Sequence, residues 1–305
     1  MNQMGGSVLI VILLLTGCQP RDEQKSPAPL PEKPTIAVSN YPLQYMAERI
    51  GSPLVEIVFP AGLSGDPAYW KPSAEEVAAL QKADLILLNG ASYEQWLKGV
   101  SLPSSRVVET AAGFEDEWIA LPGTVSHSHG PEGKHEHGEI AFTTWLDLSL
   151  ALKQAGAVRD ALTAHWPEHA SLFRDNAAKL ERDFTVLDRE LFQIGQRAGK
   201  LSVVFSHPVY QYLERRYGLK GESLHWEPDA APGEEMWNEM ASVKKRTRAR
   251  VVIWEGEPPP EVRARLTTMG LSSVVFDPCG NTPSTGDFLS IMRGNVASLD
   301  SAFGH

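Results

Sequence analysis

Residues 167–197 form the stretch PEHASLFRDNAAKLERDFTVLDRELFQIGQR. Its apolar side chains recur every three to four residues, at Leu172, Ala177, Leu180, Phe184, Leu187, Leu191 and Ile194. This spacing predicts one amphipathic helix, with Pro167 in its first turn and Gly199 at its end. A helix of about 30 residues would be roughly 45 Å long, which suits a spine that crosses two lobes. Two shorter helices with a bend near Asp183 are the alternative.

Short apolar and β-branched runs lie on both sides of this helix and alternate with amphipathic stretches. The first set covers residues 35–39, 54–59, 84–88 and 106–109, and the second covers 201–206, 221–226, 250–254 and 273–276. Strands that alternate with helices indicate βαβ units and a parallel sheet. We therefore expect an α/β fold with lobes at 35–166 and 198–305. Each lobe would be a roughly four-stranded parallel sheet with helices on both faces, and the long spine helix would join them.

The N-terminus has the features of an export signal. Val8–Leu15 is an almost unbroken apolar run that is too short to span a bilayer, as in the h-region of a secretory signal. The following Leu15-Thr16-Gly17-Cys18 resembles a bacterial lipobox, although residues 1–17 lack the usual Lys or Arg. We predict a signal peptide at 1–17, a lipid on Cys18 and a flexible tether at 18–34. An uncleaved anchor and a plain signal peptide are the alternatives, and both would also place the rest of the chain outside the cytoplasm.

Composition narrows the classes of function. The formal net charge of -10 argues against nucleic-acid binding, which needs a basic surface, and it is compatible with attracting cations. The 42% hydrophobic content permits a substantial core. The chain has 2 Cys, so a lipid on Cys18 would leave Cys279 without a disulfide partner.

Four of the nine histidines lie in residues 126–138, SHSHGPEGKHEHG. They are His127, His129, His135 and His137. Imidazole is the commonest protein ligand for borderline transition metals. Two His-x-His pairs separated by Gly and Pro therefore predict a flexible chelating arm. A polar surface loop without a specific ligand is the alternative.

Polar side chains follow the predicted strands of the second lobe, where ligands bind in open parallel sheets. The four strands run into His207, then His225 and Glu227, then Glu255, and finally Asp277. We predict His207, His225, Glu255 and Asp277 as metal ligands, because two imidazoles and two carboxylates around one crevice suit Zn²⁺ or Mn²⁺. Each residue alone has another explanation, since a strand-end carboxylate often caps the next helix.

Several segments resemble the zinc/manganese-binding periplasmic solute-binding proteins of bacterial metal ABC importers. The segments GDPAYWKPS (65–73), ADLILLNG (83–90) and EQWL (94–97) are similar to the first lobe of that family. The segments FSHPVYQY (205–212) and FDPCG (276–280) are similar to those that carry its third and fourth ligands. The resemblance covers about residues 35–305. It implies two α/β lobes joined by one long helix, with a metal between them.

The resemblance is incomplete in the first lobe. The family pattern D-P-H has its first ligand where this chain has Ala68, and the second, in H-x-W-L-D, falls at Thr143. Only His207 and Asp277 carry over. His225 and Glu255, or the histidine arm, are the available replacements. Our hypothesis is that the arm folds back to complete the site, with His135 and His137 as the first candidates.

These features predict a lipid-anchored monomeric receptor outside the cytoplasm. It would capture zinc, with manganese as the second choice, and deliver it to the membrane permease of an ABC importer. We expect no enzymatic activity, because the sequence contains neither H-E-x-x-H nor a nucleophile elbow. The alternatives are a periplasmic metal buffer with a degenerate site and a zinc-dependent hydrolase.

Overall fold

The computed structural model describes Met1 and residues 33–63, 65–121, 126–129, 133–136, 140–199 and 201–303. For residues 62, 63, 126–129 and 133–136 it describes the backbone alone. The predicted signal peptide, Cys18 and almost all of the predicted tether lie outside the described residues. Residues Lys33–His305 form one compact unit.

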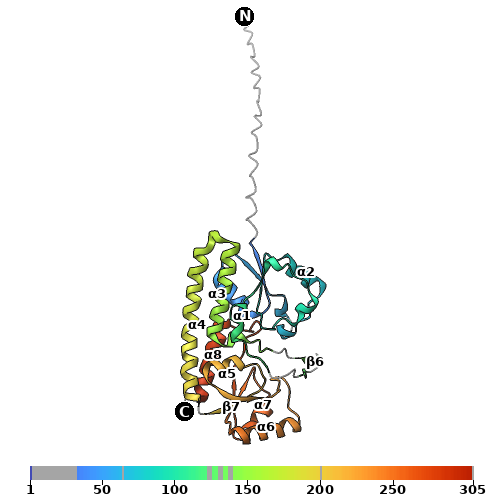
Figure 1. Cartoon of the computed structure of the whole chain (residues 1–305), viewed down its shortest axis with the longest axis vertical. Coiled ribbons are helices and arrows are strands. Elements are labelled where there is room, and N and C mark those ends of the chain that lie inside the picture. The colour runs from blue at the N-terminus through green and yellow to red at the C-terminus, as the bar shows by residue number, and fades with distance from the viewer. Residues whose placement is uncertain are drawn as a thin grey trace. The chain divides into compact units, whose positions relative to one another are not determined.

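Two parallel four-stranded sheets confirm the predicted fold class (Figure 1). The first sheet contains β1 (Thr35–Val38), β2 (Glu56–Val58), β3 (Leu85–Leu88) and β4 (Val107–Glu109), in the order β2-β1-β3-β4. The second contains β7 (Ser202–Phe205), β8 (Lys220–Ser223), β9 (Val251–Trp254) and β10 (Ser272–Val275), in the order β10-β9-β7-β8. Six strands fall within the runs predicted from the sequence, whereas β8 and β10 each begin one residue before their runs, and β8 ends three residues early.

Helices cover both faces of each sheet. They are α1 (Tyr41–Gly51), α2 (Ala74–Lys82), α3 (Leu148–His165), α4 (Ala170–Ala198), α5 (Gln211–Tyr217), α6 (Glu234–Thr247), α7 (Pro260–Thr268) and α8 (Phe288–Phe303). A small antiparallel hairpin of β5 (Ser126–His129) and β6 (Gly133–Glu136) lies in the histidine-rich segment. No helix in the described part of the chain combines the length and apolar character that crossing a membrane requires.

The predicted spine is one continuous helix, α4, preceded by a single 3-10 turn at Pro167–His169. The alternative of two helices with a bend near Asp183 is therefore wrong. The buried residues follow the predicted spacing from Leu180 to Ile194, but Phe173, and not Leu172, is the first fully buried one. The helix runs alongside both lobes (Figure 1).

Helix α4 is tied to both lobes by neighbouring carboxylates. Asp183 forms an ion pair with Arg49 of α1, with 2.6 Å between Oδ2 and Nη2. One turn further on, Asp188 accepts two hydrogen bonds from Arg216 of α5, at 3.1 and 2.6 Å. Near its C-terminal end, α4 passes so close to α5 that a Cβ added to Gly195 would lie 1.9 Å from the Tyr217 carbonyl oxygen. The same helix thus fixes one element of each lobe.

The alternation of side chains along each strand builds three layers of core. In β7, Val203 and Phe205 join the main core along α4, while Val204 joins a second cluster under α6 and α7. This is the two-residue period of a strand that is covered on both faces. A third cluster lies on the outer face of the first sheet, where Ile86 and Leu88 of β3 pack with Leu80 of α2. The main core includes residues from both lobes.

Candidate metal centre

Two central strands of the second sheet bring His207 and Glu255 together. The strand order reverses between β7 and β9, and ligands bind at such a reversal, beyond the carboxyl ends of the strands. His207 follows β7 by two residues and Glu255 follows β9 directly. Their side chains meet with 3.0 Å between Nδ1 and Oε1. The predicted proximity of these two residues therefore exists in the structure.

His207 is buried, with 6% of its surface exposed, and carboxylates surround it. Glu227 approaches from the other side, with its Oε1 3.7 Å from Nε2. Burial works to lower the pKa of His207, but the hydrogen bond with Glu255 and the charges of Glu255, Glu227 and Asp66 raise it, and the net direction is upward. The imidazole therefore lies in a strongly negative environment that also favours a metal cation.

Asp277 lies on the same side of the site and is held rigidly. Its main chain exchanges two hydrogen bonds with the Asn295 amide of α8, at 3.0 and 2.7 Å. Its Oδ1 accepts from the backbone N–H of Cys279 at 2.7 Å. Burial raises the pKa of Asp277, the Cys279 N–H lowers it, and the charge of Glu255 raises it further.

His225 is near this group but does not line the cavity. Its ring lies 6.0 Å from that of His207, edge to face, and its side chain is exposed. Glu227 lines the cavity in its place. The sequence contains a signal for this, because Leu224 and Trp226 are apolar and alternate with His225 and Glu227. The alternation places both polar residues on one side and makes Glu227 an equal candidate.

A cavity of about 350 Å³ opens between the lobes at this point. Glu227, Glu255 and Asp277 line it from the second lobe, and Asp66, Tyr93 and Trp145 are among the residues that line it from the first. Among the described residues, no group of three or more His, Cys, Asp or Glu side chains is already arranged to hold a metal ion. The cavity is therefore acidic and accessible, but its donors do not yet converge on one point.

The two family ligand positions of the first lobe have structural roles. Ala68 is buried, and its backbone N–H donates to Asp66 Oδ1 at 2.9 Å. The Thr143 hydroxyl donates to the Val209 carbonyl across the cavity at 2.5 Å. Two further side chains bridge the lobes: Trp145 Nε1 donates to Pro278 O at 2.8 Å, and Asn281 Nδ2 donates to Gly65 O at 2.9 Å. At position 143, where the family pattern has its second ligand, this chain therefore has a contact that joins the lobes.

The equivalent strand reversal in the first sheet has a different chemistry. Asn40 and Asn89 follow β1 and β3, and their amides are hydrogen bonded at 3.2 Å. Gln154 of α3 donates to the same Asn89 Oδ1 at 3.1 Å. Glu94 accepts from the Asn89 and Gly90 N–H groups at 2.6 and 3.1 Å, and burial raises its pKa to about 7. This network is buried and largely satisfied, so the first lobe supports the site but does not repeat it.

The histidine arm is described in part. In the hairpin, His127 is paired in register with His135 and His129 with Gly133. The side chains of His127, His129 and His135, and all of His137, lie outside the described residues. The hypothesis that the arm supplies metal ligands is therefore untested by the structure.

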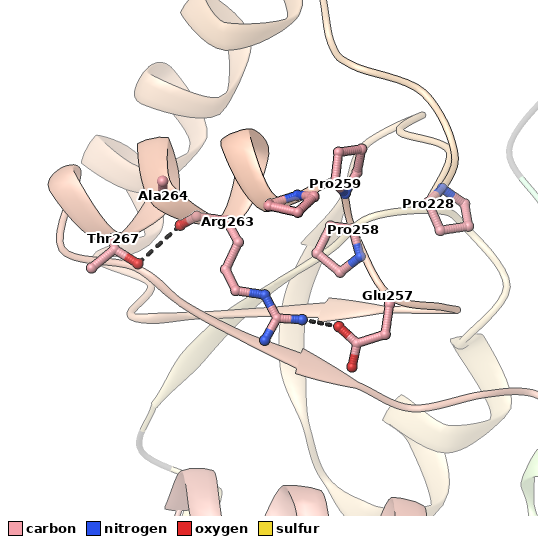
Figure 2. Close-up of a pocket in the computed structure, with 8 residues that line it drawn as sticks. Pro228, Glu257, Pro258, Pro259, Arg263, Ala264 and Thr267 are labelled. Atoms are coloured by element: carbon pink, nitrogen blue, oxygen red, sulfur yellow. Dashed lines mark hydrogen bonds and ion pairs between the residues drawn. The ribbon is translucent and has the colours of Figure 1, made fainter.

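A larger cavity of about 610 Å³ lies beside α7 and has a different lining. Figure 2 shows Pro228, Pro258 and Pro259 around it, with the Arg263 guanidinium paired to Glu257. Thr267 Oγ1 donates to the Arg263 carbonyl at 2.9 Å. Because Arg263 neutralises Glu257, the described residues that line this cavity carry no net charge, in contrast to the acidic cavity between the lobes.

Comparisons with known proteins find a matching family model and relatives of similar sequence. Residues 36–302 match the family model described as zinc-uptake complex component A, periplasmic. The zinc-binding lipoprotein AdcA of Streptococcus pneumoniae serotype 4 is 25% identical over 279 residues, which are 88% of this chain and 55% of that protein. The high-affinity zinc uptake system protein ZnuA of Bacillus subtilis is 21% identical over 80% of this chain and 77% of its own length. The chain thus spans about half the length of the AdcA relatives that it matches.

Solved structures share the fold. The Zn(II)-bound ZnuA-like domain of S. pneumoniae AdcA has a TM-score of 0.75 at 21% identity, covering 90% of this chain and 100% of that domain. The metal-dependent lipoprotein YcdH of B. subtilis also has a TM-score of 0.75, at 18% identity, over 88% of this chain and 98% of that protein. At these identities the likeness establishes a common architecture.

Proposed function

The chain belongs to the family of periplasmic zinc-uptake complex components A, and from this premise we propose that it is an extracytoplasmic receptor that captures zinc between its lobes. It then delivers the metal to the permease of an ABC importer. One observation carries this function: the acidic cavity between the lobes, where His207 is buried against Glu255 and Glu227. Negative charge concentrates cations at the cavity, and a buried imidazole supplies the nitrogen ligand that zinc prefers.

The second lobe supplies the main ligands in this proposal. His207, Glu255 and Asp277 bind the cation, and His225 lies close enough to join after rotation of its side chain. The arm residues His127, His129, His135 and His137 attract further zinc and raise its local concentration. Zinc is favoured over manganese because of the imidazole content, although the carboxylates keep manganese as a competitor.

Capture needs little movement of the lobes. Helix α4 is bound to both lobes through Asp183 and Asp188, and the hydrogen bonds from Thr143 and Trp145 cross the cavity. Rotation of carboxylate side chains, and not separation of the lobes, then brings donors to the metal. Release to the permease requires the same local change in reverse.

A lipid on Cys18 would keep the monomeric receptor beside its permease. The AdcA relative is named a lipoprotein, which supports this location. The test is Cys18→Ser in the full chain, followed by separation of membrane and soluble fractions. We expect the variant to leave the membrane fraction, whereas a chain that stays there would contradict lipid anchoring through Cys18.

The family also favours uptake over the two alternatives of a metal buffer and a zinc-dependent hydrolase. A receptor is required to bind and release, without any chemical step. The decisive experiment is zinc titration of the purified metal-free protein in competition with a chromogenic chelator. We expect one tightly bound zinc per chain, its loss in His207→Ala, and its retention in His169→Ala, a matched histidine at the start of α4. Failure of the unaltered chain to bind zinc would refute the proposal.

A further inference from the structure

Asp66 places a charge of the first lobe opposite the acidic groups of the second. It lines the cavity and caps the 3-10 turn Pro67–Tyr69 by accepting from the Ala68 N–H at 2.9 Å. Its charge helps to raise the pKa of His207, as do those of Glu255 and Glu227. The same three carboxylates raise the pKa of Tyr69, after the larger effect of burial. Asp66 is therefore within electrostatic range of the second-lobe groups, across the cavity.

Tyr93 supplies an independent sign of a ligand. Its side chain lines the same cavity and is 1% exposed. Its hydroxyl has no hydrogen-bond partner among the described residues. Burial raises the pKa of this phenol, and the nearby charge of Asp66 raises it further. A buried hydroxyl without a partner costs free energy, so a polar species in the cavity would remove that cost.

The loop before Tyr93 is built to hold it in place. Gly90, Ala91 and Ser92 all have positive φ, at 77, 50 and 63°. A run of left-handed residues, two of them not glycine, is strained and persists only where the surroundings enforce it. Here Glu94 holds the loop by accepting from Asn89 and Gly90, and the Tyr93 N–H donates to Gly90 O at 3.1 Å. Strain of this kind concentrates at functional sites.

We propose that the first lobe contributes the Asp66 carboxylate and the Tyr93 hydroxyl to the cation site, in place of ligands at positions 68 and 143. They line the same cavity as Glu227, Glu255 and Asp277, so most of the available ligand atoms are oxygens. This inference rests on the proposed function and names the first-lobe half of the same site. The described residues contain no group of three His, Cys, Asp or Glu side chains that already converges, and the cavity holds several water volumes, so in this proposal the bound divalent cation keeps part of its water shell.

The test uses Asp66→Asn and Tyr93→Phe in the full chain. Asn keeps an oxygen to accept from the Ala68 N–H, and Phe keeps the volume of the ring. Glu75→Gln is the control, because it removes an exposed carboxylate of the same lobe away from the cavity. Zinc and manganese are each titrated as chlorides by chelator competition, and thermal unfolding of the metal-free variants is recorded.

We expect Asp66→Asn to weaken zinc binding by about 10- to 100-fold, as loss of a metal-site partner does, and Tyr93→Phe to weaken it by a smaller factor. Manganese should suffer more than zinc from the loss of a carboxylate, because it is the harder cation. Unchanged zinc affinity in both variants, with loss in His207→Ala, would overturn this inference and leave the proposed function intact. Equal loss of both metals together with a lower unfolding temperature would show that Asp66 acts only as a cap, and would also overturn it.

Discussion

His207 Nδ1 lies 3.0 Å from Glu255 Oε1, and this contact joins the ends of two neighbouring strands, β7 and β9. The carboxylate either binds the metal itself or orients the imidazole toward it. In both roles its loss should weaken zinc binding. We therefore expect Glu255→Gln to lower zinc affinity about 10- to 100-fold, measured by chelator competition. Glu257→Gln, two residues further along the chain and paired with Arg263 outside the cavity, should bind zinc like the unaltered protein. If both variants bind zinc as tightly as the unaltered protein, Glu255 has no role in the metal site.

Thr143 should matter for stability and little for zinc. Its hydroxyl donates to Val209 O, so Thr143→Val leaves a carbonyl between the lobes without its donor. We expect a loss of about 1 kcal/mol in the free energy of unfolding, measured with urea. Thr143→Ser keeps the hydroxyl and should lose less. If zinc affinity falls sharply in Thr143→Val while stability holds, the hydroxyl is a ligand after all.

The histidine arm can be tested by replacing residues 126–138 with a Gly/Ser linker of equal length. Because the two His-x-His pairs are chelating units, we expect fewer zinc ions per chain and an affinity about tenfold lower. Elemental analysis and competition titration measure the two quantities. The paired change of His135 and His137 to Ala should reproduce much of the effect. Stoichiometry and affinity equal to those of the unaltered chain would exclude a role for the arm in binding.

Gly195 should tolerate no side chain. Replacing a helical glycine by alanine usually stabilises a helix by about 0.5–1 kcal/mol. At this position the new Cβ would lie 1.9 Å from Tyr217 O, so α4 and α5 must move apart. We expect Gly195→Ala to destabilise the protein by about 1–3 kcal/mol, measured by urea unfolding. Gly156→Ala in α3 is the control and should be neutral or stabilising, because in the described part of the chain no atom beyond the local helix backbone lies within 4 Å of the added Cβ.

Glu214 should make the stability of the protein depend on pH. Burial raises its pKa in the folded state from 4.5 to about 7. Between these values the folded state binds the proton and the unfolded state does not, so this group's contribution to stability falls as pH rises from about 4.5 to about 7. Glu214→Gln should remove this group's part of the slope of stability against pH, measured by thermal unfolding at several pH values in this range.

Glu222 is a control, because its pKa is shifted in the opposite direction to that of Glu214. The hydrogen bond with Arg246 lowers the pKa of Glu222 in the folded state. Its contribution to stability is therefore present above pH 4.5 and is lost as the pH falls through the lowered pKa of the folded state. Glu222→Gln should therefore leave the slope between 4.5 and 7 almost unchanged. Glu94, whose pKa is also raised to about 7, should leave part of the slope in Glu214→Gln, and an unchanged slope would show that Glu214 does not contribute to it.

The architecture could be predicted from the sequence because its signals are local. Each strand of the second lobe is a short apolar run that ends in a polar residue, and α4 has a clear helical period over Leu180–Ile194. Parallel pairing then places His207, Glu255 and Asp277 at one edge. Those residues could be identified before any coordinates were known, since strand ends of one sheet meet by topology.

The first-lobe side of the cavity could not be predicted in this way. Asp66 and Tyr93 follow no strand directly and lie in loops whose positions depend on packing. From the sequence, His225 after β8 is predicted as a ligand, yet Glu227 is the residue of this segment that lines the cavity. The role of Thr143 was also hidden, because its partner is a main-chain carbonyl that leaves no trace in the pattern of side chains.

Three hydrogen bonds between described residues bridge the cavity, and they end on the main-chain oxygens of Val209, Pro278 and Gly65. Every residue has such an oxygen, so mutation of the accepting residue does not remove the acceptor. Over many generations, side chains around the cavity can be exchanged while the two halves stay aligned. A lineage could lose the imidazoles at positions 68 and 143 without losing the frame that held them. Because the lobes stay in place, single substitutions around the cavity can change which metal it binds.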